Sequence, residues 1–322
     1  MRHKSPVVLN VTRTLYLSLG MELSLRLARS FVEGYDVNRR MGFPPSVPVP
    51  VQDAVNRIVL DLIEAGLFIE LVEWLVRTDR HGYMGKQYAI AGIDEILNGM
   101  EQEGYLLDPE SESFYEDPRK QRTPSWGRLK VGVEYPITLL RIDIANNTRV
   151  VRANGAAEVE AAYDYIRELF QRIAEKRRGR VWIWEGDGGM AAFQYGHPNM
   201  SATLCGMEFM NEILLYNLQA NPLDKPIQLR AAAHAGFLRY SENPAELLRE
   251  ELVKETVEIE SRYTAPDSFS ISASIAPHVD GIVKDCFAPP REYCPREILS
   301  YSIRPRPARA QAPAKRTVRD RV

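Results

Sequence analysis

Two aspartates in the second half of this 322-residue chain carry its clearest chemical signal. Asp143 lies at the end of an apolar run, residues 137–144, that is typical of a buried strand. Asp187 lies between Gly186 and Gly188, in a sequence typical of a β-hairpin turn. Two adjacent carboxylates repel and raise each other's pKa, and hard divalent cations such as Mg²⁺ or Mn²⁺ relieve that repulsion. Two such cations can activate a hydroxyl and hold a triphosphate for in-line displacement.

Each aspartate also has an ordinary structural interpretation. Asp-Gly is a common hairpin tip, so Asp187 alone indicates no more than a turn. Asp143 alone is equally compatible with the N-cap of a helix that follows the strand. A metal site is therefore favoured only if the fold brings the two side chains together and other motifs agree.

The elements predicted around the two aspartates form a split βαβ unit. We expect strands at residues 137–144, 180–184, 190–195, 227–233, 268–272 and 282–287, and helices at residues 154–178, 201–220 and 250–262. The order β-α-β-β-α-β predicts an α+β, ferredoxin-like fold. In that fold the first strand lies beside the central hairpin, so the carboxylates of Asp143 and Asp187 are expected to converge.

The residues before about 115 are predicted to be mainly helical. Apolar residues recur at helical spacing over residues 51–77, where Gly66 separates two helices, and a third helix over residues 93–103 ends at Gly104. Residues 108–126 contain three prolines and have the composition of a linker. We therefore predict a helical regulatory or interaction domain at 1–125, a catalytic domain at 130–303 and a disordered basic tail at 304–322.

Composition limits the classes of function. The tail has seven Lys or Arg and one Asp, a net +6, so the rest of the chain carries −8 of the total charge of −2. A nucleic-acid-binding surface on the body is therefore not expected. The three cysteines, Cys205, Cys286 and Cys294, form no C-x-x-C pair, and no secretory or transmembrane segment is expected, which together favour a cytoplasmic protein.

Four segments that occur in order carry a family resemblance: LLRIDIANNT, VWIWEGDGGMAAF, LRAAAHAG and ETVEIESRYTAPDSFSISAS. Together they resemble the class III nucleotidyl cyclase domain, the family of adenylate and guanylate cyclases, over residues 135–283. The resemblance implies that Asp143 and Asp187 bind two Mn²⁺ or Mg²⁺ ions, with the backbone carbonyl of Ile144 as a further ligand. It also implies that Arg262 stabilises the charge that develops on the α-phosphate.

The resemblance further implies a head-to-tail homodimer with shared active sites. One protomer would supply the two aspartates, and its partner would supply Arg262 and the residues that read the base. After the first strand the family has Gly-Phe-Thr, whereas this chain has Asn146, Asn147 and Thr148. Because backbone amides at a helix start would hold phosphate there, this change of side chains is tolerable.

The base-reading positions depart from the purine cyclases. A Lys or Glu four residues before the second aspartate is matched by Ile183, and a second base-reading position, usually Asp or Cys, is matched by Glu251. The Asn that orients the ribose is matched by Glu258. Because the side chain of Ile183 cannot donate a hydrogen bond to a purine, ATP does not follow as the substrate.

Three hypotheses remain open for the substrate. The first is a cyclase for UTP or CTP, similar to those of bacterial antiphage systems, in which Trp182, Trp184 or Tyr263 stacks on the base. The second is an adenylate cyclase with a divergent base pocket. The third is a catalytically inactive module that senses nucleotides or dimerises. For the enzyme, the N-terminal domain would contact a regulatory partner. Both aspartates and Arg262 are present, which favours an active enzyme.

Overall fold

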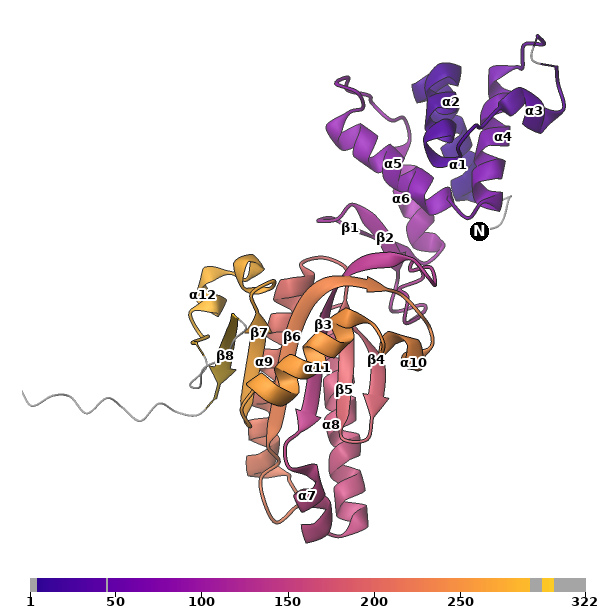
Figure 1. Cartoon of the computed structure of the whole chain (residues 1–322). Helices are drawn as coiled ribbons and strands as arrows, with labels where there is room; N and C mark the ends of the chain where they lie inside the picture. The colour runs from indigo at the N-terminus through magenta and orange to yellow at the C-terminus, as the bar shows by residue number, and fades with distance from the viewer. Residues whose placement is uncertain (1–4, 45, 290–296, 304–322) are drawn as a thin grey trace, which may run out of the picture. The chain divides into compact units, whose positions relative to one another are not determined.

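The chain divides into two compact units in a computed structural model, which describes residues 5–44, 46–289 and 297–303 (Figure 1). Unit 1 comprises Met1–Val133 and Tyr195–His197, and unit 2 comprises Glu134–Gln194 and Pro198–Val322. The predicted tail at 304–322 and Cys294 lie outside the described residues. The predicted boundary between residues 125 and 130 stays a prediction.

Unit 1 is mainly helical, with one small hairpin. Its elements are α1 (Pro6–Thr14), the π-helix η1 (Leu15–Leu19), α2 (Gly20–Phe31), α3 (Val37–Met41), α4 (Val51–Glu64), α5 (Phe68–His81), α6 (Ile93–Gln102), β1 (Tyr105–Asp108) and β2 (Ser113–Glu116). Gly66 separates α4 from α5 with a φ of +68°, and Gly104 follows α6 with a φ of +94°. The helices predicted from apolar spacing in this region are therefore present, because their buried faces form one core.

The segment 108–126 is packed rather than extended. Strand β2 pairs with β1, and Asp108 and Trp126 are fully buried. The Trp126 ring lies 5.8 Å from the ring of Tyr195, which also lies 5.1 Å from that of Tyr115. The linker prediction was wrong for this segment, because its prolines and charges mark turns between residues that bury large aromatic rings.

Unit 2 is built on one six-stranded sheet with the order β4-β5-β3-β6-β7-β8. The strands are β3 (Glu134–Ile144), β4 (Arg180–Glu185), β5 (Gly188–Phe193), β6 (Leu229–Arg239), β7 (Ser268–Ser272) and β8 (Ile298–Ser302). Neighbouring strands run antiparallel except β6 and β7, which are parallel. From β3 to β6 the elements follow the predicted β-α-β-β-α-β order, with the short helix α7 added before α8, so the predicted α+β fold is confirmed.

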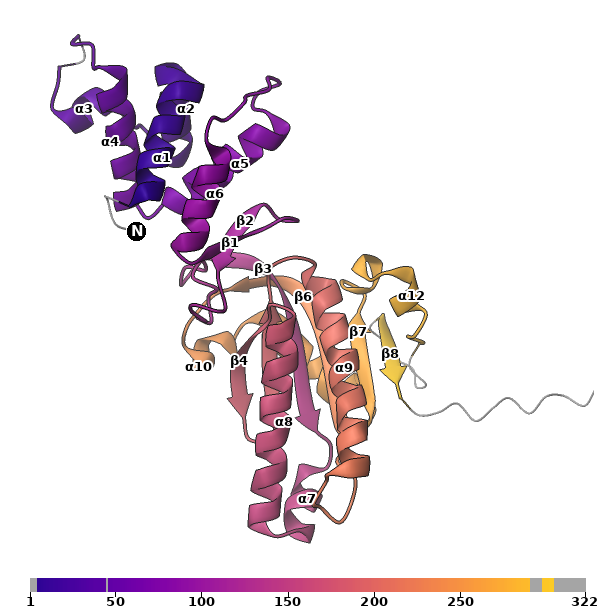
Figure 2. The ribbon, with the colours of Figure 1, turned by 180° about the vertical axis from the view of Figure 1, so that it is seen from behind.

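Helices cover both faces of this sheet. The helices of unit 2 are α7 (Asn147–Ala153), α8 (Ala156–Lys176), α9 (Pro198–Gln219), α10 (Pro244–Leu247), α11 (Glu251–Tyr263), the 3₁₀ turn η2 (Ala276–His278) and α12 (Gly281–Lys284), and of these α8, α9 and α11 cover the sheet. Figure 1 shows α11 on one face, and Figure 2, seen from behind, shows α8 and α9 across the other. Apolar side chains from α8, α9 and the strands form the core between these layers.

The last predicted strand, residues 282–287, was wrong. Its first residues belong to the short helix α12, where the Asp280 side chain accepts a hydrogen bond from the Ile282 amide at 2.9 Å. The Ile282 side chain is exposed, so its apolar character does not mark a core position. Strand β8, which was not predicted, occupies the sheet edge beside β7.

Over the described ranges, none of the helices combines the length and apolarity needed to cross a membrane.

Candidate active site

The strand register brings Asp143 and Asp187 together. Strand β3 pairs with β5 so that Asp143 lies opposite Gly188, the residue directly after Asp187. The hairpin between β4 and β5 turns over only two residues, Gly186 and Asp187, and Gly186 has a φ of +58°, which glycine adopts without strain. A Cβ on Gly188 would lie 2.7 Å from the carbonyl oxygen of Ile142 and 3.1 Å from Asp143 Oδ1. The predicted convergence is therefore present, and it depends on the glycines.

The charge of Asp143 acts on Asp187. Burial is the main cause that raises the pKa of Asp187 above its ordinary value, and the Asp143 carboxylate adds to it. A hydrogen bond from the backbone amide of Asp187 itself, the Arg141 guanidinium and a hydrogen bond from the Asn147 side chain act in the opposite direction. The repulsion between the two carboxylates is thus only partly relieved by the protein itself.

A tyrosine that the sequence analysis did not identify lies beside the pair. The Tyr163 hydroxyl on α8 donates a hydrogen bond to Asn147 Oδ1. Burial, Asp187 and Asp143 raise the pKa of Tyr163 to about 12. The Asn147 side chain therefore links Tyr163 to Asp187, which is a more specific position than the backbone contact expected for it. Its neighbours Asn146 and Thr148 are exposed, and Asn146 has a φ of +60°.

A buried ionic cluster joins Asp143 to helix α11. Arg230 Nη2 on β6 donates to Asp143 Oδ2 at 2.6 Å, and Arg230 Nε lies 3.0 Å from Glu260 Oε1. Arg141 Nε donates to Glu260 Oε2 at 3.4 Å. The side chain of Glu260 is only 2% exposed. Arg141 could have been identified from the sequence, because it is a charged residue two positions before Asp143 and therefore lies on the same face of an apolar strand.

The oxygen donors at this site fit divalent cations. Mg²⁺ is commonly held by one or two carboxylates, with waters and substrate phosphates completing its shell. Asp143 and Asp187 supply such a pair, and Ile144, which follows Asp143 with its side chain buried, has only its backbone carbonyl to offer. No cluster of three or more His, Cys, Asp or Glu suited to a metal occurs in the part of the chain that the structure describes. A cation here must also compete with Arg230 for Asp143.

Three of the predicted substrate-binding and catalytic residues lie on α11. The Arg262 side chain is 71% exposed and donates to Glu258, one turn earlier, at 3.2 Å. Glu251 is also exposed and lies 3.9 Å from Lys254. Among the described residues, no hydrogen bond or ion pair joins Arg262 to Asp143 or Asp187 in the same chain. The structure therefore brings the aspartates together but does not bring Arg262 to them.

The predicted base-reading strand is packed. Ile183 on β4 is 3% exposed and pairs with Met190 in the strand register. The Trp184 ring lies 6.1 Å from the Phe170 ring on the core side, and Arg167 lies over Trp184 at 5.9 Å. The Trp182 ring lies 5.5 Å from that of Tyr240. Trp184 therefore serves core packing.

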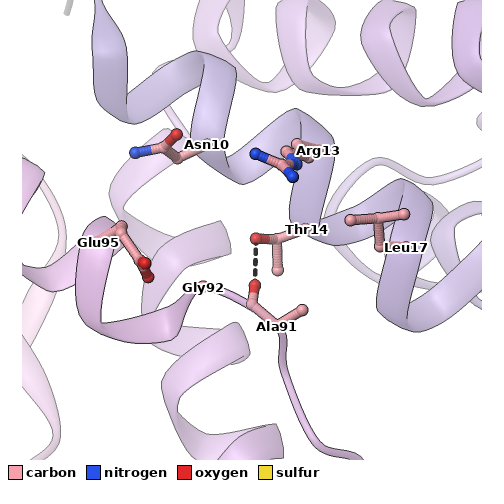
Figure 3. A pocket seen from close by; sticks show the side chains of 7 residues that line it. All are labelled: Asn10, Arg13, Thr14, Leu17, Ala91, Gly92 and Glu95. Atoms are coloured by element: carbon pink, nitrogen blue, oxygen red, sulfur yellow. Dashed lines mark hydrogen bonds between the residues drawn. The ribbon is translucent and has the colours of Figure 1, made fainter.

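A second concave feature lies inside unit 1 (Figure 3). It is an opening of about 200 Å³ lined by Asn10, Arg13, Thr14, Leu17, Ala91, Gly92 and Glu95. Thr14 Oγ1 closes one side by donating to the Ala91 carbonyl at 2.6 Å. Because ligand pockets usually span roughly 300–1,000 Å³, this opening gives little support for a regulatory ligand.

No protein-family model and no curated protein matches the chain. Solved structures do. The guanylyl cyclase Cya2 is 19% identical, with a TM-score of 0.42 over 53% of this chain and 92% of its own. The adenylyl cyclase CyaB from P. aeruginosa is 17% identical, with a TM-score of 0.43 over 52% of this chain and 93% of its own. An adenylate/guanylate cyclase/hydrolase from Silicibacter pomeroyi is 17% identical, with a TM-score of 0.41 over 53% and 98%.

At such identities and TM-scores the likeness concerns the fold alone, and the chemistry must be judged from the residues of this chain. The part of the chain that these structures cover is similar to nucleotidyl cyclase catalytic domains, as its four sequence segments resemble the class III family.

Proposed function

We propose that this protein is a nucleotidyl cyclase, a phosphorus–oxygen lyase that converts a ribonucleoside triphosphate into a 3′,5′-cyclic nucleotide and pyrophosphate. The observation that carries the proposal is the register of β3 against β5, which places Asp143 beside Asp187, where burial and then the Asp143 charge raise the pKa of Asp187. A β-turn does not require a second carboxylate beside it, because the two negative charges repel. A site that binds hard cations does require the second carboxylate.

The residues of the chain divide the chemistry between them. The carboxylates of Asp143 and Asp187 would hold two Mn²⁺ or Mg²⁺ ions, which when bound supply charge neutralisation of the triphosphate and acidify the 3′-hydroxyl. Asn147 orients Asp187 and is itself oriented by the Tyr163 hydroxyl. In the reaction the 3′-oxygen forms a bond to the α-phosphorus as the bond from that phosphorus to the pyrophosphate oxygen breaks, and the hydroxyl proton leaves to solvent.

A second copy of the chain would complete the site. The guanidinium of Arg262 is exposed, and among the described residues its one charged neighbour is Glu258, so it is available to another molecule. In a head-to-tail homodimer the partner's Arg262 would stabilise charge on the α-phosphate. The same arrangement would bring in the partner's Ile183, Glu251 and Glu258 around the base and ribose.

The base is proposed to be a pyrimidine. Ile183 is buried and apolar, and it offers no hydrogen bond to the ring edge that would distinguish a purine. UTP or CTP is therefore the favoured substrate, with a cyclic pyrimidine nucleotide as a second messenger in cytoplasmic antiphage signalling and unit 1 as the contact for a regulatory partner. An adenylate cyclase with a divergent pocket is the second candidate, and an inactive nucleotide-sensing module is the third.

The test is turnover with each of the four ribonucleoside triphosphates in the presence of Mn²⁺. We expect one cyclic product, identified by mass spectrometry, and no product from Asp187→Ala. Asp285→Ala, an exposed aspartate on the same unit, is the matched control and should keep full activity. Four intact triphosphates after incubation with wild-type protein would move the assignment to a sensing module.

Complementation tests the shared site. Asp187→Ala, inactive alone, and Arg262→Ala, strongly impaired alone, should show higher activity when mixed, because mixed dimers contain one intact site. A mixture of Asp143→Ala and Asp187→Ala is the control, since both changes affect the same half of the site and no dimer is repaired. Equal activity in the two mixtures would refute the head-to-tail arrangement.

A further inference from the structure

Glu260 is a buried carboxylate with no role in the proposed chemistry so far. Its side chain is 2% exposed and is flanked by two guanidinium groups, from Arg141 and Arg230. Arg230 Nε and Glu260 Oε1 lie 3.0 Å apart, but their orientation does not make a hydrogen bond, and both atoms are buried without one. A buried charge is costly unless other charges and hydrogen bonds compensate for it, so the position calls for a physical reason.

Arg230 faces two carboxylates at once. Its Nη2 makes the short bond to Asp143 at 2.6 Å, while its Nε faces Glu260. Arg141 holds the other oxygen of Glu260 at 3.4 Å and so fixes the orientation of that carboxylate. The cluster of Asp143, Glu260, Arg141 and Arg230 therefore has two negative and two positive groups, and Asp143 is the member that also faces Asp187.

We propose that Glu260 is a positioning residue that keeps the charge of Arg230 neutralised when Asp143 binds a divalent cation in place of Arg230. The inference rests on the proposed metal-binding function of Asp143. If Asp143 gives up its bond to Arg230, a guanidinium that is only 24% exposed loses its closest partner. Glu260 leaves it with a second carboxylate at 3.0 Å, which lowers the cost of the exchange.

The opposite case shows what Glu260 prevents. Without its charge, Arg230 would have Asp143 as its one close carboxylate and would compete with the cation for it. Removal of a group that supports a metal ligand from behind typically weakens metal affinity about 10–100-fold. Glu260→Gln, which keeps the shape and removes the charge, should therefore raise the Kd for Mn²⁺ by that factor.

A double-mutant cycle separates this role from a general loss of structure. In Arg230→Gln the competitor is absent, so adding Glu260→Gln should change the Kd for Mn²⁺ little. Glu255→Gln is the matched control, because Glu255 lies on the same helix but pairs with His234 at 3.1 Å, outside the cluster. Its Kd for Mn²⁺ should equal that of the wild type.

The measurement is the electron paramagnetic resonance signal of free Mn²⁺ during titration of the full chain without nucleotide, with circular dichroism to verify folding. If Glu260→Gln does not fold, Arg141→Gln with Glu260→Gln restores the balance of charge in the cluster and should show the same weakening. The expected result is a 10–100-fold weaker Kd that disappears in the Arg230→Gln background.

Unchanged Mn²⁺ affinity in Glu260→Gln, together with lost affinity in Asp143→Ala, would overturn the role of Glu260 and leave the proposed function intact. Equal weakening by Glu260→Gln with and without Arg230 would also overturn it, since the effect would then not act through Arg230. Wild-type protein that binds no Mn²⁺ would remove the proposed function and this inference together.

Discussion

The two halves of the proposed site differ in how far one chain builds them. The aspartate half is held from several sides, by the β3–β5 register, the two-residue turn, the hydrogen bond from Asn147 and the ionic cluster. The α11 half presents Arg262 and Glu251 to solvent, and in the described part of the chain their ion pairs are with Glu258 and Lys254 on the same helix. A single chain would therefore suffice to bind the metal ions, whereas stabilisation of the transition state would require Arg262 from a second chain.

The largest effect that tests this contrast is expected from Arg262→Ala. Loss of a donor that stabilises a developing oxyanion typically costs about 10²–10³-fold in kcat. The free energy of unfolding should change by less than about 0.5 kcal/mol, because Arg262 is exposed and its one ion pair lies within a helix. Steady-state kinetics and thermal unfolding of the same preparation measure both. A large fall in Tm would show that Arg262 stabilises its own chain and is not simply an exposed residue available to a second chain.

Gly188→Ala should produce an intermediate effect with the opposite balance. The added Cβ would lie 2.7 Å from the Ile142 carbonyl, so β3 or β5 must shift, at a cost of about 1–3 kcal/mol of stability. Mn²⁺ affinity should fall as well, since the Asp143 carboxylate lies 3.1 Å from the new atom. Gly281→Ala, where nothing lies within 4 Å of the added Cβ, is the control and should change neither quantity.

The smallest effect concerns Asp187 in metal-free protein. Because its pKa is raised in the folded state, ionisation of Asp187 is easier in the unfolded chain, and stability is lost as pH rises from the ordinary value of 3.8 through the folded pKa. At neutral pH, Asp187→Asn should therefore raise Tm slightly. The difference should vanish below pH 3.8 and should reverse when Mn²⁺ is added at neutral pH. If Asp187→Asn is less stable than the wild type at neutral pH without metal, the claim that the folded protein raises the pKa of Asp187 is contradicted.

Local patterns predicted the fold around the aspartates well. Apolar composition identified β3, the glycines identified the turn at Asp187, and element order identified the sheet neighbours, because each signal lies within a few residues. The same local signals failed at α12, where a capping aspartate outweighs apolar residues, and in the segment 108–126, where tertiary packing of Trp126 outweighs turn-forming composition.

Local sequence patterns could not predict the ionic cluster of Asp143, Arg230, Arg141 and Glu260. Arg141 and Glu260 are 119 residues apart, and Asp143 and Arg230 are 87 apart, so nothing in either neighbourhood indicates the pairing. Charged residues in a helix are usually exposed, as Arg262 and Glu251 are, and the burial of Glu260 on the same helix follows only from its position against the sheet. The roles of Ile183, Glu251 and Glu258 at a base stay predictions.

The position of Tyr163 gives the site an optical reporter. After burial, the negative charges of Asp187 and Asp143 are what hold its pKa near 12, so neutralisation of those charges by a cation would lower that value. Phenolate absorbs ultraviolet light that phenol does not, so the difference between alkaline titrations of the wild type and Tyr163→Phe would isolate this group from the other tyrosines and register the charge on the carboxylate pair. The ultraviolet absorbance of Tyr163 on α8 would therefore report, in solution, the negative charge carried by the two carboxylates.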